Sequence, residues 1–175
     1  MTGVFHELDG PVRSSLKALM KQHPREVWAG ISRLLLGNDY LKRHRIESLV
    51  GIEQDNHLGP GFLYAIPEDF YLEWTRNDPA HRAYLVMKWL PIAMKGEGSS
   101  LSWHTALESF ILEFGDEEKV LEVLSSRLHP GSYHGSLAPY LDPQVKLMES
   151  WSTHPRSEVR KWARDRINWI KTQVQ

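Results

Sequence analysis

The chain has 175 residues, of which 41% are hydrophobic and 25% charged, with a formal net charge of −1. These values are ordinary for a globular domain with a sizeable core, and the near-zero charge gives no global basic field to attract nucleic acid. Cysteine is absent, which excludes disulfides, thiol catalysis and cysteine-ligated zinc.

No stretch predicts a targeting or membrane segment. Residues 1–20 lack the basic region and long apolar run of a secretion signal. The apolar run at residues 85–94, LVMKWLPIAM, is interrupted by Lys88 and Pro91 and falls short of the roughly 20 residues that span a bilayer. The sequence therefore predicts a cytoplasmic protein with no membrane contact.

Hydrophobic periodicity predicts helices along almost the whole chain. They cover residues 11–22, 24–36, 39–50, 67–76, 79–90, 101–114, 117–128, 143–152 and 155–173. Glycine and other turn-forming residues predict loops between some of them, and no segment has the alternation of a strand. The predicted loops are residues 51–61, 95–100 and 129–139. The sequence thus predicts an all-α fold of about eight to ten helices, an α-solenoid or an irregular bundle.

Three of the breaks between helices resemble one another. Each places a polar residue and a proline before an amphipathic helix that contains tryptophan, at His23-Pro24, Asp78-Pro79 and His154-Pro155. The last two pairs lie 76 residues apart, and Gly115-Asp116 falls near the middle of that interval. Half of the interval, about 38 residues, is close to the period of two-helix solenoid repeats. The first interval is longer because it includes residues 39–61.

The last predicted helix carries the most specific pattern. After His154-Pro155 come Val159-Arg160, then Ala163 four residues beyond the valine, and Ile167 four residues further. This order resembles the second helix of a HEAT repeat. The resemblance implies a HEAT-like α-solenoid of antiparallel helix pairs, with residues 1–175 as a single helical-repeat domain.

Two further expectations concern the whole layout. The final helix has a polar outer face, as a C-terminal cap requires, whereas the first helices are less clearly capped. We therefore expect that the domain can be the C-terminal part of a longer protein. The layout also resembles the helical solenoid regions of large bacterial antiviral-defence and sensor NTPases, although no NTPase motif is present. This implies a sensor or scaffold arm in bacterial defence.

A helical wheel divides the last helix into an apolar and a basic face. Six apolar residues fall within an arc of roughly 160°, which is the width of a core-facing stripe. They are Val159, Trp162, Ala163, Ile167, Trp169 and Ile170. Arg166 projects into this arc, so it needs a partner or a route to solvent.

The basic face has two open interpretations. A charged helix face that is exposed to water needs no function. The resemblance to HEAT repeats implies that Arg160 forms an ion pair with an acidic residue of a neighbouring repeat. Alternatively, cations that face one way can bind phosphate groups or another partner. The candidate residues are Arg156, Arg160, Lys161, Arg164 and Lys171.

Two other segments raise similar alternatives. Tyr133 and His134 lie between glycines, which predicts either a tightly packed turn or an exposed recognition element. Both residues are therefore included in the candidate binding surface. The basic run Lys42 to Arg45 spreads around its helix, which favours an exposed connector over a nucleic-acid patch.

No catalytic or metal-binding motif is present. The chain lacks HExxH, GxSxG and a phosphate-binding loop, and its nine histidines are scattered. His23 and His154 precede helices, which predicts a role as caps or turn residues. The sequence therefore predicts no catalytic residues, no metal and no cofactor.

The predicted function is a non-enzymatic module that binds a protein partner. The alternative is a nucleic-acid-binding HEAT-like domain that uses the basic helix face. A third hypothesis, a hydrolase assembled from dispersed histidines and carboxylates, predicts a pocket with strongly perturbed titratable groups.

Overall fold

A computed structural model describes residues 4–50, 66–95, 101–129 and 136–173. These residues form nine α-helices and a two-stranded sheet, which confirms the predicted all-α class and helix number. The helices are α1 (Val4–Gln22), α2 (Pro24–Leu35), α3 (Tyr40–Val50), α4 (Glu68–Arg76), α5 (Pro79–Met87), α6 (Thr105–Phe114), α7 (Glu118–Arg127), α8 (Ala138–Trp151) and α9 (Ser157–Gln173). Within these ranges, no helix is both long and apolar enough to cross a membrane.

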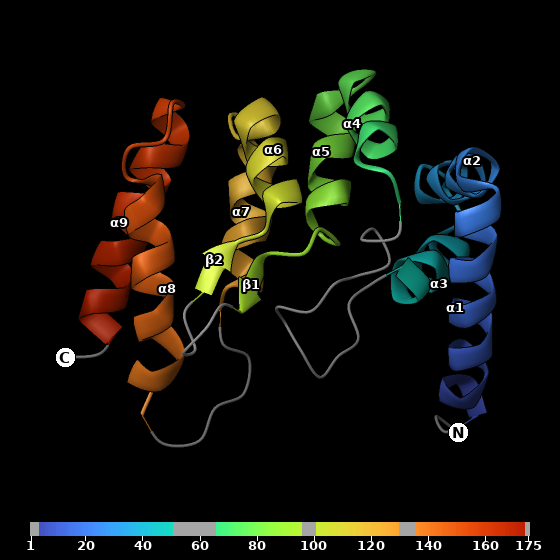
Figure 1. Cartoon of the computed structure of the whole chain (residues 1–175), viewed down its shortest axis with the longest axis horizontal. Helices are drawn as coiled ribbons and strands as arrows, with labels where there is room; N and C mark the ends of the chain where they lie inside the picture. Colours follow the sequence, from blue (N-terminus) through green and yellow to red (C-terminus); the bar gives the residue numbers. More distant parts are fainter. Residues whose placement is uncertain (1–3, 51–65, 96–100, 130–135, 174–175) are drawn as a thin grey trace.

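The helices follow one another in a row, with α1 to α3 at one end and α8 and α9 at the other (Figure 1). Neighbours in the row pack together: α1 with α2 and α3, α4 with α5, α5 with α7, and α8 with α9. One hydrophobic cluster includes residues from Met20 of α1 to Ala163 of α9. The core is therefore continuous along the row.

Local signals explain several helix starts. α2 and α5 begin at Pro24 and Pro79. Proline is favourable at the first helical position, because a backbone N–H there would have no intrahelical acceptor. α4 begins after Pro67 with Glu68 and Asp69 in its first turn, where carboxylates complement the helix dipole.

The short sheet differs from the prediction. β1 (Ala93–Lys95) pairs antiparallel with β2 (Leu101–Trp103), and Ala93 lies opposite Trp103. The helix predicted from residue 101 is therefore wrong over its first residues, because α6 begins only at Thr105. Three strand residues are too few to distinguish alternation from the first turn of an amphipathic helix.

Trp103 explains how the sheet is held in the fold. Its ring stacks on Trp151 of α8, with ring centroids 4.0 Å apart and planes 17° from parallel. Its indole N–H donates to the Leu147 carbonyl oxygen at 2.9 Å and to Ser150 Oγ at 3.1 Å. Stacking and hydrogen bonding together stabilise a buried indole, so Trp103 fixes β2 against α8.

Two helices start earlier than predicted and contain a proline. α1 begins at Val4 rather than near Pro11, and α8 begins at Ala138 rather than near Pro143. A proline removes one backbone hydrogen bond, but the other i→i−4 bonds of a longer helix can continue around it. The helix starts predicted at Pro11 and near Pro143 are therefore wrong.

Arginines tie neighbouring helices in the middle of the row. Arg76 of α4 donates two hydrogen bonds to the Glu113 carboxylate of α6, at 2.5 and 2.7 Å. Arg127 of α7 donates to the carbonyl oxygens of Met87, the last residue of α5, and of Leu90 beyond it, at 2.8 and 2.6 Å. Burial lowers the pKa of Arg127 to about 10.

Candidate functional site

α9 has the two faces that the wheel predicts. Val159, Ala163 and Ile170 are buried, whereas Trp162, Ile167 and Trp169 are half-buried. The apolar face is therefore the core-facing side of α9.

Arg166 has the partners that its position on this face requires. Its Nη2 donates to the Leu128 carbonyl oxygen at 3.2 Å, and its guanidinium lies 4.2 Å from the centroid of the Trp169 ring. Burial lowers the pKa of Arg166. The half-buried charge is thus stabilised by a carbonyl dipole and an aromatic face.

Two of the candidate binding residues are engaged within the fold. Arg156 donates to the carbonyl oxygens of Leu112 and Glu113 at the end of α6, and its Nη1 lies 2.7 Å from Asp116 Oδ2. These carbonyls belong to the last helical turn, where they lack intrahelical partners, so Arg156 caps α6 from the turn just before α9. Its guanidinium is therefore held by the fold.

Arg160 stabilises the turn before its own helix. Its Nη1 donates to the carbonyl oxygens of His154 and Pro155, at 2.7 and 2.8 Å. Among the described residues it makes no ion pair, so the link between neighbouring helices that the HEAT resemblance implies for Arg160 is made instead by Arg156 with Asp116.

The remaining cations of α9 form an exposed surface, the α9 stripe, defined as Lys161, Arg164 and Lys171. Their spacing of three and seven residues places them on one face of the helix. The carboxylates Glu158 and Asp165 are exposed beside them. Tyr133 and His134, the other predicted members of this surface, lie outside the described residues.

Sequence reasoning missed an apolar surface at the turn between α2 and α3. This α2–α3 patch consists of Leu34, Leu36, Tyr40 and Leu41, which are 37%, 44%, 65% and 75% exposed. The buried stripe of α2 runs through Trp28, Ile31 and Leu35. Leu34 lies off that stripe, and this offset is the signal in the sequence that could have revealed the patch.

The α2–α3 patch has a cationic border. Residues 33–45 contain four cations, Arg33, Lys42, Arg43 and Arg45, against the single carboxylate of Asp39. Lys42 Nζ lies 3.2 Å from Asp39 Oδ2, and the Tyr40 ring is stacked on His44 with centroids 5.9 Å apart. An apolar centre with a charged border is the usual anatomy of a protein-binding surface.

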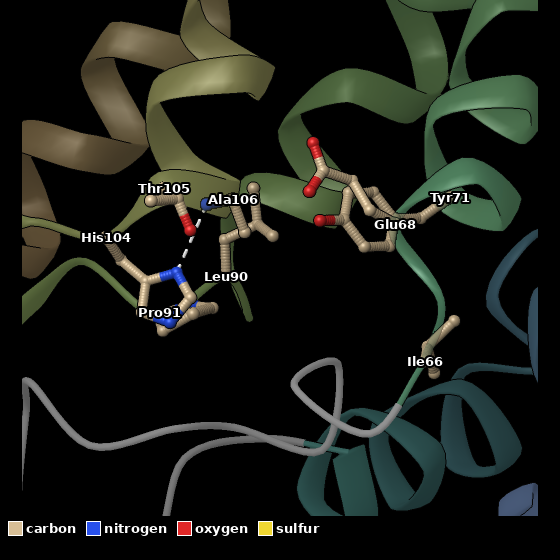
Figure 2. A pocket seen from close by; sticks show the side chains of 8 residues that line it. All are labelled: Ile66, Glu68, Tyr71, Leu90, Pro91, His104, Thr105 and Ala106. Atoms are coloured by element: carbon tan, nitrogen blue, oxygen red, sulfur yellow. Dashed lines mark hydrogen bonds between the residues drawn. The ribbon is translucent and has the colours of Figure 1, made fainter.

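A pocket of about 210 Å³ lies where the start of α4 meets the start of α6 (Figure 2). Glu68 and Tyr71 of α4 line one side, and His104, just before α6, lines the other. Ile66 and Leu90 contribute apolar walls.

His104 is held in one orientation because it caps α6. Its Nδ1 accepts a hydrogen bond from the backbone N–H of Ala106 at 3.2 Å, shown as the dashed line in Figure 2. Burial lowers the pKa of His104, while the nearby Glu68 acts to raise it. At neutral pH the imidazole is uncharged, and its proton is on Nε2 because Nδ1 is the acceptor.

The Tyr71 hydroxyl is also neutral. Burial raises the pKa of Tyr71, and the charges of Glu68 and Asp69 raise it further. The only charged group that lines this pocket among the described residues is therefore the Glu68 carboxylate.

A second, more open pocket of about 260 Å³ separates α2 from α4. Trp28 and Trp74 meet edge to face there, with centroids 5.5 Å apart. The Arg25 guanidinium lies 5.0 Å from the centroid of the Phe70 ring at the same interface. These aromatic contacts join the α1–α3 group to the rest of the row.

No group of three or more histidine, aspartate or glutamate side chains is placed to hold a metal ion within the described ranges. Comparison with protein-family models, with curated proteins and with solved structures finds no match to this chain. The HEAT-like character of the repeats therefore stays a prediction from the residues of α9 and the spacing of the turns.

Proposed function

We propose that the chain is a protein-interaction module built from HEAT-like helix pairs, and that the α2–α3 patch anchors its partner. The observation that carries this proposal is the exposure of Tyr40 and Leu41, 65% and 75%, beside two further exposed leucines. Single exposed apolar residues are common, but four within eight residues make a surface that a partner can cover. Aromatic and aliphatic anchors dominate the binding energy of such interfaces.

The border of the patch indicates the chemistry of the partner. Four cations and one carboxylate at residues 33–45 favour a protein surface with acidic residues around an apolar anchor. The partner's apolar side chains would cover the α2–α3 patch, and its carboxylates would face Arg33 and Arg43.

The pocket at His104 gives less support to hydrolysis. Nucleophilic catalysis needs a hydroxyl that is hydrogen-bonded to its base. His104 Nδ1 instead accepts the Ala106 N–H, and no hydrogen bond between described residues joins the imidazole to the Thr105 hydroxyl. This arrangement favours a binding role over a hydrolytic one.

Within the same proposal, the module serves as a sensor or scaffold arm in bacterial defence. This part depends on the resemblance of the helical layout to bacterial defence and sensor proteins. A role in defence predicts that a bacterial host without this chain is more sensitive to phage infection. Unchanged sensitivity would exclude that role.

The test of partner binding compares two surface variants with the wild-type chain. The wild type captures its partner from a host lysate, with the amounts measured by quantitative mass spectrometry. We expect Tyr40→Asp/Leu41→Asp to reduce capture at least about tenfold, because charged residues would replace two anchors. Leu112→Asp is the matched control, since Leu112 is 54% exposed on α6, away from the patch. Equal capture by all three chains would contradict the proposal.

A second candidate function, nucleic-acid binding, is favoured by the exposure of the α9 stripe. Because Arg156 and Arg160 are engaged in the fold, Lys161, Arg164 and Lys171 remain as the cations of this face. Three phosphate contacts predict a slope of about −2.7 in log K against log [salt] for duplex DNA. Fluorescence anisotropy at low salt measures it, with Lys161→Glu/Arg164→Glu as the control variant. No binding at low salt would exclude this function.

A further inference from the structure

The pocket between α4 and α6 contains a carboxylate that no cation among the described residues pairs with. Glu68 is half-buried, and Figure 2 shows its carboxylate directed into the space between α4 and the segment that carries His104 and Thr105. No ion pair or side-chain hydrogen bond of Glu68 is formed within the described residues. A half-buried carboxylate without a cation is a site where a cationic ligand gains binding energy.

The other titratable side chains that line the pocket among the described residues, Tyr71 beside Glu68 and His104 opposite it, are neutral. The Tyr71 hydroxyl stays protonated, because burial and the neighbouring carboxylates raise the pKa of Tyr71. His104 is uncharged at neutral pH, because burial lowers the pKa of its imidazole. The Tyr71 hydroxyl can accept a hydrogen bond from an ammonium group, and the uncharged His104 imidazole adds no positive charge that would repel it.

An anionic ligand fits this pocket less well. A helix N-terminus often binds anions through its free N–H groups. At the start of α6 three of those groups are used, since the N–H of Ala106 donates to His104 Nδ1, and the N–H groups of Leu107 and Glu108 donate to the His104 carbonyl oxygen. An anion would also meet the charge of Glu68.

The size and walls of the pocket limit the cation to a small one. A volume of about 210 Å³ lies below the range of about 300–1,000 Å³ that is usual for drug-sized ligands. Ile66, Leu90 and Pro91 provide apolar walls for an aliphatic stem. We infer that this pocket binds a primary ammonium group on a short aliphatic stem, supplied by a free alkylamine or by the lysine side chain of a peptide. The inference does not depend on the α2–α3 patch.

The test is an NMR titration of the ¹⁵N-labelled full chain, read at the backbone amides of Thr105 and Ala106. The probes are n-butylammonium and the peptide acetyl-Gly-Lys-Gly-amide. Their uncharged counterparts are n-butanol and the same peptide with norleucine in place of lysine. We expect saturable shifts with at least one of the charged probes, at a dissociation constant of the order of millimolar, and none with the uncharged ones. The arm that saturates identifies the source of the ammonium group.

Two variants test whether Glu68 holds the charge. Glu68→Gln keeps the shape of the side chain and removes its charge, so we expect binding to weaken at least about tenfold. Glu73→Gln removes an exposed carboxylate from the same helix outside this pocket and should leave binding unchanged. The inference is overturned if neither charged probe gives saturable shifts, if the uncharged probes bind equally well, or if Glu68→Gln binds like the wild type.

Discussion

Within the part of the chain that the structure describes, arginine side chains donate most of the side-chain hydrogen bonds between helices. Arg127, Arg156 and Arg166 each donate to backbone carbonyl oxygens at or near the end of another helix. The terminal carbonyls of a helix lack intrahelical donors, and a guanidinium can bind several of them at once. The cations of this chain are therefore divided between structural donors and exposed surface charges.

Arg127 gives the sharpest test of that division. Arg127→Ala removes the donor to Met87 and Leu90 and leaves a void, so we expect the free energy of unfolding to fall by about 2–4 kcal/mol. Arg164→Ala, on the exposed α9 stripe, should change it by less than about 0.5 kcal/mol. Urea unfolding measures both. Equal effects of the two variants would show that the arginines do not divide in this way.

His104 and His154 make stability depend on pH. Each Nδ1 accepts a backbone N–H, from Ala106 and Arg156 respectively. Burial, the largest cause, lowers the pKa of both below the ordinary value of 6.5. The unfolded chain therefore binds protons more readily, so stability is retained above pH 6.5 and is lost as the pH falls below it.

We expect the free energy of unfolding to fall between pH 7.5 and pH 5.5, by up to about 1 kcal/mol for each cap. His104→Asn and His154→Asn keep an acceptor that does not titrate, so each should reduce this pH dependence. His23→Asn is the control, because the His23 side chain makes no cap hydrogen bond. Urea unfolding at the two pH values measures the difference. If His104→Asn and His154→Asn keep the pH dependence of the wild type, these two histidines are not its cause.

At the residue scale, the sequence predicts which side chains require a hydrogen-bond partner, but it does not predict which residue supplies that partner. A helical wheel shows that Arg166 faces the core and must be paired, but it cannot name the Leu128 carbonyl 38 residues away. His154 accepts the Arg156 N–H just before α9, which fits the cap or turn role predicted for it, whereas His23 occupies the N-cap position of α2 without a side-chain hydrogen bond. The tertiary partners depend on how helices approach, which a single helix pattern does not contain.

At the scale of elements, the join between α6 and α9 depends on a close approach at Gly115. A Cβ at this position would lie 2.5 Å from the Ile111 carbonyl oxygen and 2.7 Å from Val159 Cγ2. Both distances are shorter than van der Waals contact, so only glycine lets Val159 of α9 pack against the end of α6.

A pair of glycine variants tests this contact. Gly115→Ala must displace α9 or the end of α6, and we expect it to lower the free energy of unfolding by about 1–3 kcal/mol. Gly30→Ala lies inside α2, where a Cβ would meet nothing within 4 Å, so it should raise stability by about 0.5–1 kcal/mol. Thermal unfolding measures the stability of both variants relative to the wild-type chain. A neutral Gly115→Ala would mean that α6 and α9 do not approach this closely.

Element types are predicted well where apolar periodicity is long, and boundaries less well. The helices at residues 24–36 and 117–128 match α2 and α7 closely, since turn signals mark both of their ends. β1 and β2 could not be predicted, because three-residue strands exist through their pairing and through Trp103 on Trp151, both of which are tertiary contacts. The early starts of α1 and α8 show that proline alone does not mark a helix start.

At the scale of the whole molecule, the two candidate surfaces lie at opposite ends of the row. The α2–α3 patch belongs to the N-terminal group of helices, and the α9 stripe belongs to the last helix (Figure 1). The sequence indicated the basic surface from charge and periodicity alone. It did not indicate the apolar one, because exposure at a turn depends on how α2 and α3 pack.

This separation allows one measurement to test the central claim, which is that the chain works through the α2–α3 patch. Hydrogen–deuterium exchange of the full chain is measured with and without its captured partner. We expect slower exchange in residues 34–45, where the partner covers the patch, and unchanged exchange in residues 157–173. Slower exchange confined to residues 157–173, or no change in either segment, would contradict the account.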